Sequence, residues 1–270
     1  MPVRDVLVVA AAKGGIAAHD VVDGSVRWSA PDAVSAGRYL SLSDRLVAAV
    51  DRDGTLVTFV ASTGEPKWTS PARAASLLAA DAEAVYVITE DGRVRAIGRS
   101  DAEVRWTVRV DADLGEKAAS RGLAARRRLV ITAADGSVVA LDTADGREVW
   151  QHRRLTGSGR AQADHSGGTL CVTGKQLYAF DLAGGRRLWS TDSPKLPDGA
   201  PAFWSSPTID GPVVYATEVV FPFSSMSGRE RPPTGATAAS SNAMRAAPRP
   251  PGRRPLVGGF RWGAGGSPGP

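Results

Sequence analysis

The side chains that could bind a metal ion or perform acid–base chemistry are few and far apart in this sequence. It has three histidines, His19, His152 and His165, and one cysteine, Cys171. None of the histidines stands at a metal-ligand spacing from another histidine or from the cysteine, so we expect no zinc site. A single cysteine cannot form an internal disulfide, and its place in a run of β-forming residues predicts a buried, unreactive thiol.

Two charged clusters and two small-residue motifs have a functional and an ordinary interpretation. The run Asp111–Glu116 begins like a calcium-binding loop but lacks the later ligands of an EF-hand, which favours an acidic loop between strands. Arg126–Arg128 precede a predicted strand, where a solvated edge explains them at least as well as an anion site. Ser205-Ser206 and the glycine-rich turns lack the strand–turn–helix context of a nucleophile elbow or a phosphate loop. We therefore predict no catalytic residue, no metal site and no bound cofactor.

Tryptophan is the residue whose spacing carries the most information. Five of the seven tryptophans recur at intervals of 40, 38, 44 and 39 residues, and each closes a similar short phrase. These five are Trp28, Trp68, Trp106, Trp150 and Trp189. A period near forty residues is typical of a repeat architecture. We expect the five side chains to lie in the core rather than to form a stacking surface for a ligand.

Each period contains two tight turns separated by short runs of β-forming residues. Asp-Gly pairs at 53–54, 91–92 and 135–136 predict hairpins with type I′ turns. A second turn comes shortly before the tryptophan. No segment shows a sustained apolar period of 3.6 residues, so we expect few helices. Short antiparallel strands with two tight turns per period predict an all-β fold, a β-propeller of four-stranded blades.

The phrase that ends in tryptophan resembles the docking motif of the pyrroloquinoline quinone (PQQ) repeat family, whose usual form is Ala-x-Asp-x-x-Thr-Gly-x-x-x-Trp. The similarity covers about residues 5–217, and the span from the first position to the tryptophan is the same in all five copies. In this family the indole ring packs against the neighbouring blade and the aspartate fixes the turn. The resemblance thus implies a structural docking motif that comprises, besides the five tryptophans, Asp20, Asp142, Asp181, Gly24, Gly64, Gly146 and Gly185.

Two copies depart from this pattern. The second copy has Thr58 and Val60 at the alanine and aspartate positions. The third copy has Gly98 at the aspartate position and Ala102 in place of the turn glycine. We therefore expect blades two and three to dock more loosely than the others.

The repeat pattern stops near Val220. The run Val213–Thr217 resembles an earlier blade strand, but the tryptophan expected near position 235 is absent, which predicts a truncated sixth blade. Residues 221–270 hold nine of the 18 prolines, seven arginines and one acidic residue, without strand periodicity. We divide the chain into PQQ-like repeats at 1–220 and a disordered tail at 221–270. A reading-frame change near Val220 is one hypothesis for the composition of this tail.

Charge, edges and hydropathy limit the partners. The arginine-rich tail accounts for the net charge of +5, and we expect no specific nucleic-acid partner. Five repeats and a truncated sixth predict an incomplete ring, whose open blade edges would allow self-association. No window is long enough for a transmembrane helix, and no convincing signal peptide is seen. Cytoplasm is the default location, and a location outside it follows if the chain belongs to a longer exported or membrane-anchored protein.

The resemblance implies two classes of function. The first, which we favour, is a non-catalytic scaffold that binds a protein or small ligand at a propeller face. It would be a fragment of a larger sensor or assembly protein, such as the outer-membrane assembly lipoprotein or the repeat domain of a membrane serine/threonine kinase.

The alternative is a fragment of a PQQ-dependent quinoprotein dehydrogenase. There the cofactor stacks on a tryptophan and against a vicinal Cys-Cys disulfide, beside a calcium ion held by Glu, Asn and Asp. This chain has one cysteine, Cys171, and one asparagine, Asn242, so the repeats lack the disulfide and the asparagine ligand. Trp204 is the spare tryptophan that could line a channel.

Overall fold

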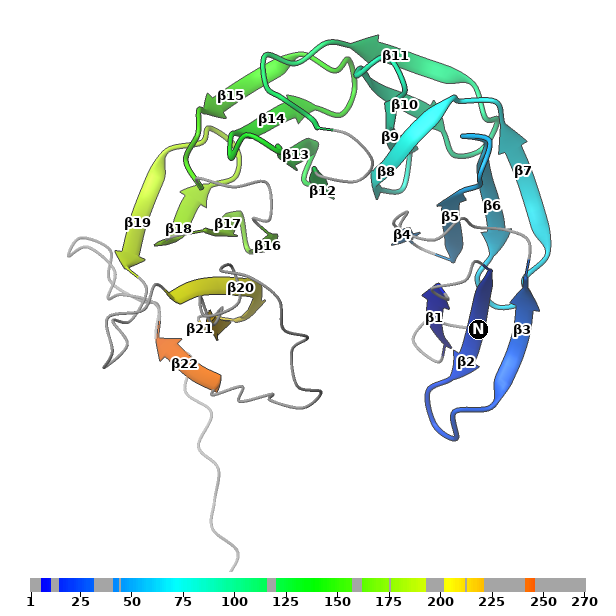
Figure 1. Ribbon diagram of the computed structural model, residues 1–270, viewed down its shortest axis with the longest axis horizontal. Coiled ribbons are helices and arrows are strands. Elements are labelled where there is room, and N and C mark those ends of the chain that lie inside the picture. Colours follow the sequence, from blue (N-terminus) through cyan, green and yellow to red (C-terminus); the bar gives the residue numbers. More distant parts are fainter. Residues whose placement is uncertain are drawn as a thin grey trace, which may run out of the picture.

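The computed structural model is an open ring of antiparallel sheets. It describes residues 6–10, 15–31, 41–43, 45–115, 120–156, 162–174, 176–192, 202–211, 213–220 and 241–245. Within these residues there is no helix, and the strands form six sheets, which we call blades 1 to 6 in chain order. Figure 1 shows the blades following one another along an arc. The expected all-β propeller with an incomplete ring is therefore confirmed.

Four of the blades have four strands, and the first and last have three among the described residues. Blade 1 consists of β1 (Val6–Ala10), β2 (Ile16–Asp20) and β3 (Val26–Ala30). Blade 2 consists of β4 (Ser41–Ser43), β5 (Leu46–Val50), β6 (Leu56–Val60) and β7 (Pro66–Ser70). Blade 3 consists of β8 (Ala74–Ala80), β9 (Ala84–Thr89), β10 (Val94–Gly98) and β11 (Val104–Val108).

The remaining blades repeat this order. Blade 4 consists of β12 (Arg121–Ala125), β13 (Arg128–Thr132), β14 (Val138–Asp142) and β15 (Glu148–His152). Blade 5 consists of β16 (Ala163–Ser166), β17 (Thr169–Thr173), β18 (Gln176–Asp181) and β19 (Arg187–Asp192). Blade 6 consists of β20 (Ala202–Asp210), β21 (Val213–Val220) and β22 (Ser241–Arg245). The first strand of blades 2 to 6 lies toward the centre of the arc, and blades 1 and 6 stand at its two ends without meeting (Figure 1).

The hydrophobic core lies between blades rather than inside any one of them. Five clusters of buried side chains fill the five junctions between consecutive blades. In β13, Leu129 and Ile131 pack toward blade 3, whereas Val130 between them packs toward blade 5. Because side chains alternate across a strand, a blade with neighbours on both sides buries both faces. This is why runs such as Leu46–Val50 are apolar and buried throughout.

The hairpin turns differ from the predicted type. Type I′ turns need positive φ at both central residues, but in the Asp-Gly pairs only the glycine has it, with φ of 78° at Gly54, 74° at Gly92 and 83° at Gly136. The N–H of Gly92 donates to the carbonyl of Thr89 at 2.9 Å, and that of Gly136 donates to Ala133 at 3.0 Å. These are three-residue loops that end in a left-handed glycine. The predicted hairpins are confirmed, but the predicted type I′ turns were wrong.

Part of the segment 221–270 has structure that the composition did not predict. Strand β22, Ser241–Arg245, pairs with β21 in blade 6 from Val213↔Arg245 to Thr217↔Ser241. The described structure therefore differs from the expectation of a tail without strands at these five residues. The other residues of this segment lie outside the described part of the chain.

Candidate functional site

The docking tryptophans join each blade to the next by one hydrogen bond. Each indole Nε1–H of blades 1 to 4 donates to a backbone carbonyl in the turn of the following blade. The four pairs are Trp28 to Ala61 at 2.9 Å, Trp68 to Arg99 at 2.7 Å, Trp106 to Thr143 at 2.9 Å and Trp150 to Leu182 at 3.1 Å. The fifth, Trp189, is partly buried against the core cluster between blades 5 and 6, to which Trp204 and Val214 belong.

The turn glycine of the following blade lies directly against the indole ring. A Cβ added to Gly64 would approach Trp28 to 2.6 Å, one on Gly146 would approach Trp106 to 2.7 Å, and one on Gly185 would approach Trp150 to 2.5 Å. Real Cβ atoms essentially never come so close. Glycine is therefore needed there for space as well as for its positive φ.

Each copy of the phrase begins with a β-bulge that the sequence did not reveal. In all five copies the register of strand pairing shifts between the first and second residues of the phrase, as between Ala140 and Leu141. The first residue of the phrase then pairs directly with the tryptophan, as in Ala140↔Trp150 and Ala179↔Trp189. A small side chain beside the indole explains the alanine of the phrase. The phrase carried a signal for this pairing, because its first residue is alanine in four of the five copies and stands at a constant distance from the tryptophan.

The motif aspartates accept hydrogen bonds from the backbone of their own turns. Asp20 accepts the N–H of Val22 at 2.8 Å, Asp142 that of Ala144 at 2.9 Å, and Asp181 that of Gly184 at 2.9 Å. The hydrogen bond from Val22 and the Arg27 side chain hold the pKa of Asp20 below its usual value.

Asp142 also has two arginine partners. Its pKa is lowered first by the Ala144 N–H and then by the charges of Arg127 and Arg128. Arg127 and Arg128 lie 3.5 and 3.3 Å from its carboxylate oxygens. Arg128 also donates to the carbonyl of Ala183 in blade 5 at 3.2 Å. Arg127 and Arg128 therefore neutralise the charge of Asp142 rather than standing unpaired at a solvated strand edge.

In the two divergent copies the hydrogen bond from the indole is as short as in the other copies. Thr58 occupies the alanine position, and its hydroxyl donates to the carbonyl of Trp68 at 2.7 Å. Ala102 occupies the turn-glycine position with φ of 61°. The bond from Trp68 to Arg99, at 2.7 Å, is the shortest of the four. We expect looser docking of blades two and three, but the length of this bond gives no sign of it.

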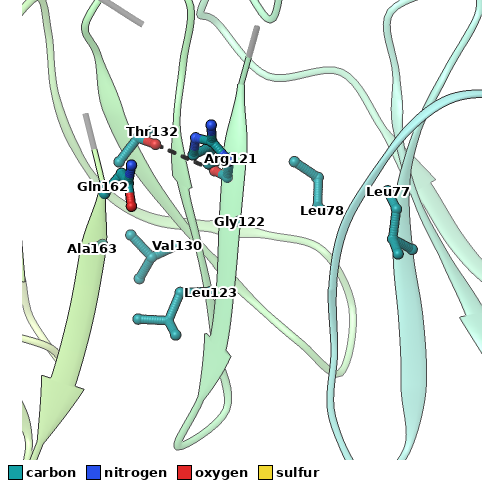
Figure 2. Close-up of a pocket in the computed structure, with 9 residues that line it drawn as sticks. All are labelled: Leu77, Leu78, Arg121, Gly122, Leu123, Val130, Thr132, Gln162 and Ala163. Atoms are coloured by element: carbon teal, nitrogen blue, oxygen red, sulfur yellow. Dashed lines mark hydrogen bonds between the residues drawn. The ribbon is translucent and has the colours of Figure 1, made fainter. Parts of the chain in front are cut away.

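One cavity opens among the inner strands of blades 3 to 5, as Figure 2 shows. It has a volume of about 230 Å³, with walls that are part apolar and part polar. The lining residues are Leu77, Leu78, Arg121, Gly122, Leu123, Val130, Thr132, Gln162 and Ala163. Gly122 brings β12 onto β8, since a Cβ there would meet Leu78 at 2.7 Å.

A second cavity, of about 430 Å³, lies between blades 2 and 3 near their turns. Arginine and lysine side chains dominate its wall, together with Glu83 and Ser100. The cations are Arg45, Lys67, Arg99 and Arg105. Arg99 is buried and donates to the carbonyl of Asp81 at 3.0 Å, and Arg105 pairs with Asp101. Both are thus engaged in holding blade 3 together.

The histidines serve the turns and the core. His19 bonds the carbonyl of Gly24 at 3.0 Å, and His152 bonds that of Gly185 at 2.8 Å while stacking on Phe180. His165 lies in β16, ahead of the hairpin turn at Gly167 and Gly168. In the part of the chain that the structure describes, no group of three or more His, Cys, Asp or Glu side chains could hold a metal ion.

The remaining candidates are structural in their placement. Cys171 is fully buried, and burial raises the pKa of its thiol to about 12. In the acidic loop, Asp113 accepts the N–H of Gly115 at 2.8 Å and Asp111 pairs with Arg153. Glu116 lies outside the described residues, and Asn242 lies in β22. Trp204 is 5 % exposed and lies in the core between blades 5 and 6, so it does not line an open channel.

These residues do not fit the PQQ site of a quinoprotein dehydrogenase. The single cysteine rules out a vicinal disulfide, and the spare tryptophan is enclosed by core side chains. The motif aspartates Asp20 and Asp142 accept hydrogen bonds from their own turns and pair with arginines. We derive no redox step from such a site.

Comparison with known proteins identifies the family of the repeats. A family model described as outer membrane protein assembly factor BamB matches residues 12–231. The chain belongs to this BamB-like family of PQQ-repeat proteins. A curated relative, the outer membrane protein assembly factor BamB of Burkholderia pseudomallei, is 29 % identical over 213 residues, which are 70 % of this chain and 53 % of the relative. The chain therefore spans about half the length of this relative.

Two solved structures were also similar. BamB from Moraxella catarrhalis has a TM-score of 0.49 at 17 % identity, with 78 % of each chain covered. A computationally designed protein, Ika8, has a TM-score of 0.53 at 16 % identity, with 79 % of this chain and 77 % of that chain covered. The second likeness supports the fold alone. Within the described residues no helix is both long and apolar enough to cross a membrane.

Proposed function

We propose that this BamB-like propeller segment is a non-catalytic scaffold that binds a protein partner at the centre-facing strands of blades 3 to 5. The observation that carries the proposal is the cavity of Figure 2, which joins apolar side chains from consecutive blades to one guanidinium and one amide. Its lining has the hydroxyl of Thr132 but no His, Cys, Asp or Glu side chain, and a mixed apolar and polar wall of this kind suits recognition. The relative named as an assembly factor supports a role of this kind.

The lining defines the segment that would bind. Leu78 and Leu123 can pack against an apolar side chain of the partner, while Arg121 can pair with a carboxylate beside it. Gln162, on the opposite side of the cavity from Leu78 (Figure 2), can bond an extended backbone. An acidic segment with one apolar anchor is the partner that this wall fits best.

Site-specific photo-crosslinking tests the proposal. A benzoylphenylalanine at Ala163, which lines the cavity, should trap one partner in cells, and Arg121→Glu in the same protein should abolish that product. The matched control places the crosslinker at Arg52, which is exposed in a hairpin turn of blade 2. Equal products at both positions, or none at Ala163, would rule out this face.

The quinoprotein alternative has a separate test. Titration of the chain with PQQ and calcium should leave the intrinsic tryptophan fluorescence unchanged apart from the inner-filter effect. A saturable change in tryptophan emission would contradict the non-catalytic assignment.

A further inference from the structure

A cation accompanies the motif aspartate in blades 1 and 4. In blade 1, Arg27, the residue before the docking tryptophan, donates from Nε to Asp20 at 2.9 Å. In blade 4, Arg127, in the turn between the two inner strands, lies 3.5 Å from the carboxylate of Asp142. The cation therefore comes from one of two fixed positions in the blade, and each time its partner is the aspartate of the same blade.

Blade 3 keeps such a pair although its motif aspartate is missing. Gly98 stands at the aspartate position, and the carboxylate comes from Asp101 of the same turn. Arg105, which corresponds to Arg27, donates to Asp101 at 2.5 Å. A Cβ on Gly98 would collide with the Asp101 carboxylate, so this group occupies the space that a side chain at position 98 would fill. The loss of one acid is thus offset by another.

Blade 2 keeps both cation positions and has no acid in the place of the aspartate. Arg45 corresponds to Arg127, since each precedes the strand residue that lies opposite the aspartate position. Lys67 precedes its docking tryptophan, as Arg27 does, and Val60 occupies the aspartate position. Within the described part of the chain, neither Arg45 nor Lys67 forms an ion pair.

The backbone donor of this turn is also present in blade 2. The N–H of Ser62 corresponds to that of Ala144, which donates to Asp142 at 2.9 Å. Among the described residues the Ser62 N–H has no acceptor. Glu65, the acidic residue of the turn, accepts a hydrogen bond from the hydroxyl of Thr63 at 3.3 Å. Two cations and one N–H therefore lack the acceptor that the turns of other blades provide.

Both cations line the cavity of about 430 Å³ between blades 2 and 3. Leu46 and Val60 add an apolar part to its wall, and Glu83 is the carboxylate among its lining residues. Arg45, Lys67 and Glu83 are exposed, so the charged groups lie where a ligand can reach them from solvent. The two lining arginines of blade 3 are bound within that blade. The remaining two cations and one carboxylate leave one positive charge in excess.

We infer that this cavity binds an aspartate or glutamate side chain from an acidic peptide segment of a protein partner. The carboxylate takes the place of the missing motif aspartate and accepts hydrogen bonds from Arg45, Lys67 and the N–H of Ser62. The cavity is larger than a carboxylate alone needs, and apolar atoms beside that group pack on Leu46 and Val60. One excess positive charge suits a carboxylate better than a phosphate group, which carries more charge.

This site is separate from the cavity of Figure 2. The two cavities share no lining residue, and they lie between different strands of the arc. The inference therefore stands or fails independently of the partner proposed for the inner strands.

A substitution that supplies the carboxylate from within the chain tests the inference. Val60→Asp restores the motif aspartate and should fill the site, whereas Val60→Asn is the matched control of similar shape without the charge. The probe is a fluorescein-labelled pentapeptide with a central aspartate between two leucines, titrated with the full chain at low ionic strength. Fluorescence anisotropy should show about fivefold or more weaker binding to Val60→Asp than to the unsubstituted chain or to Val60→Asn. A peptide with asparagine at its centre should lose as much affinity.

The introduced carboxyl also gives a measurement that needs no peptide. In Val60→Asp its pKa should lie below the ordinary value of 3.8, as the pKa of Asp142 does, because the same kinds of donors surround it. Lys67→Met in the same chain should raise that pKa, since a cation is removed. NMR titration of the carboxyl measures both values. An ordinary pKa in Val60→Asp overturns the inference.

The binding experiment has outcomes that overturn the inference in different ways. Absence of binding to the unsubstituted chain, or equal affinity for Val60→Asp, removes the site. Loss of binding in Arg121→Glu but not in Val60→Asp would place the peptide in the cavity of Figure 2. Tighter binding of a phosphoserine peptide would assign the site to a phosphate group. Binding that appears only in Asp44→Asn would show that Asp44, outside the described residues, serves as the acceptor.

Discussion

Gly146 lies so close to the ring of Trp106 that a Cβ on the glycine would come within 2.7 Å of the ring atom Cε3. The two residues belong to consecutive blades, and the indole N–H of Trp106 bonds the carbonyl of Thr143 in the same turn. One turn therefore sets both the distance and the orientation between two sheets. Substitutions at the turn should report on docking between blades.

The first prediction compares two glycine substitutions with the same backbone. Gly146 has φ of 75° and Gly92 has φ of 74°, but only Gly146 faces an indole, since a Cβ on Gly92 would meet nothing within 4 Å. Gly92→Ala should cost about 1–2 kcal/mol from positive φ alone. Gly146→Ala should cost about 1–3 kcal/mol more from overpacking. Urea unfolding measures both, and equal losses would show that the ring is not held against the glycine.

The second prediction concerns the docking ring itself. Trp150 is 8 % exposed and packs with Phe180 of blade 5 at a centroid distance of 6.2 Å. Trp150→Ala should lower the free energy of unfolding by about 3–5 kcal/mol, because it leaves a cavity between two blades. Trp262→Ala, outside the described residues, should change it by less than about 0.5 kcal/mol. Similar effects of both substitutions on the melting curve would contradict the motif assignment.

The third prediction concerns acid. The pKa of Asp142 lies below its ordinary value of 3.8, chiefly through the Ala144 N–H and then Arg127 and Arg128. Its stabilising effect is complete above the pKa of the unfolded chain and is lost as the pH falls through the lower, folded pKa. Stability should therefore drop below about pH 4, and less steeply in Asp142→Asn. Denaturant melts at several pH values measure the two slopes.

The exposed hairpin variant Asp53→Asn serves as the control for the acid experiment. Its pH profile should follow that of the unsubstituted chain. If Asp142→Asn also follows it, the ion pairs with Arg127 and Arg128 do not hold this turn.

The fourth prediction concerns the thiol of Cys171. Burial raises its pKa to about 12 from 9.0, so it stays protonated in the folded chain and should resist iodoacetamide at pH 8. Its contribution to stability is present below about pH 9 and declines as the pH rises toward the folded pKa, because the unfolded thiol ionises first. Alkylation followed by mass spectrometry, native and in guanidinium, measures the protection. Rapid native alkylation would contradict burial.

The fold could be predicted from sequence because the repeat marks every blade in the same way. The spacing of Trp28, Trp68 and the later tryptophans set the number of blades, and the glycines located the turns. Asp-Gly alone did not determine the type of hairpin turn, because the same pair of residues also fits a loop in which only the glycine has positive φ. Strand β22 was missed because its sequence, Ser241–Arg245, has no apolar alternation and depends on pairing with β21.

The candidate site was predictable only in part. The tryptophans and glycines followed from the phrase, but the pairing of Ala140 with Trp150 depends on a bulge that spacing does not reveal. Arg127 and Arg128 pair with Asp142, which follows them by 14 or more residues, so these ion pairs form only when the fold brings its turn close. The cavity near Leu78 and Gln162 brings together side chains from three blades, and no local pattern marks it.

The placement of the core between blades has a consequence for unfolding. A blade in the middle of the arc contributes to two apolar clusters, as β13 does through Leu129 and Val130, whereas blade 1 contributes to one. Stability is then a sum of nearest-neighbour terms along a linear array, and each unit is held by as many interfaces as it has neighbours. Such an array frays from its ends: amide exchange should be fastest in blades 1 and 6 and slowest in blades 3 and 4. A closed ring has no end at which this fraying can begin.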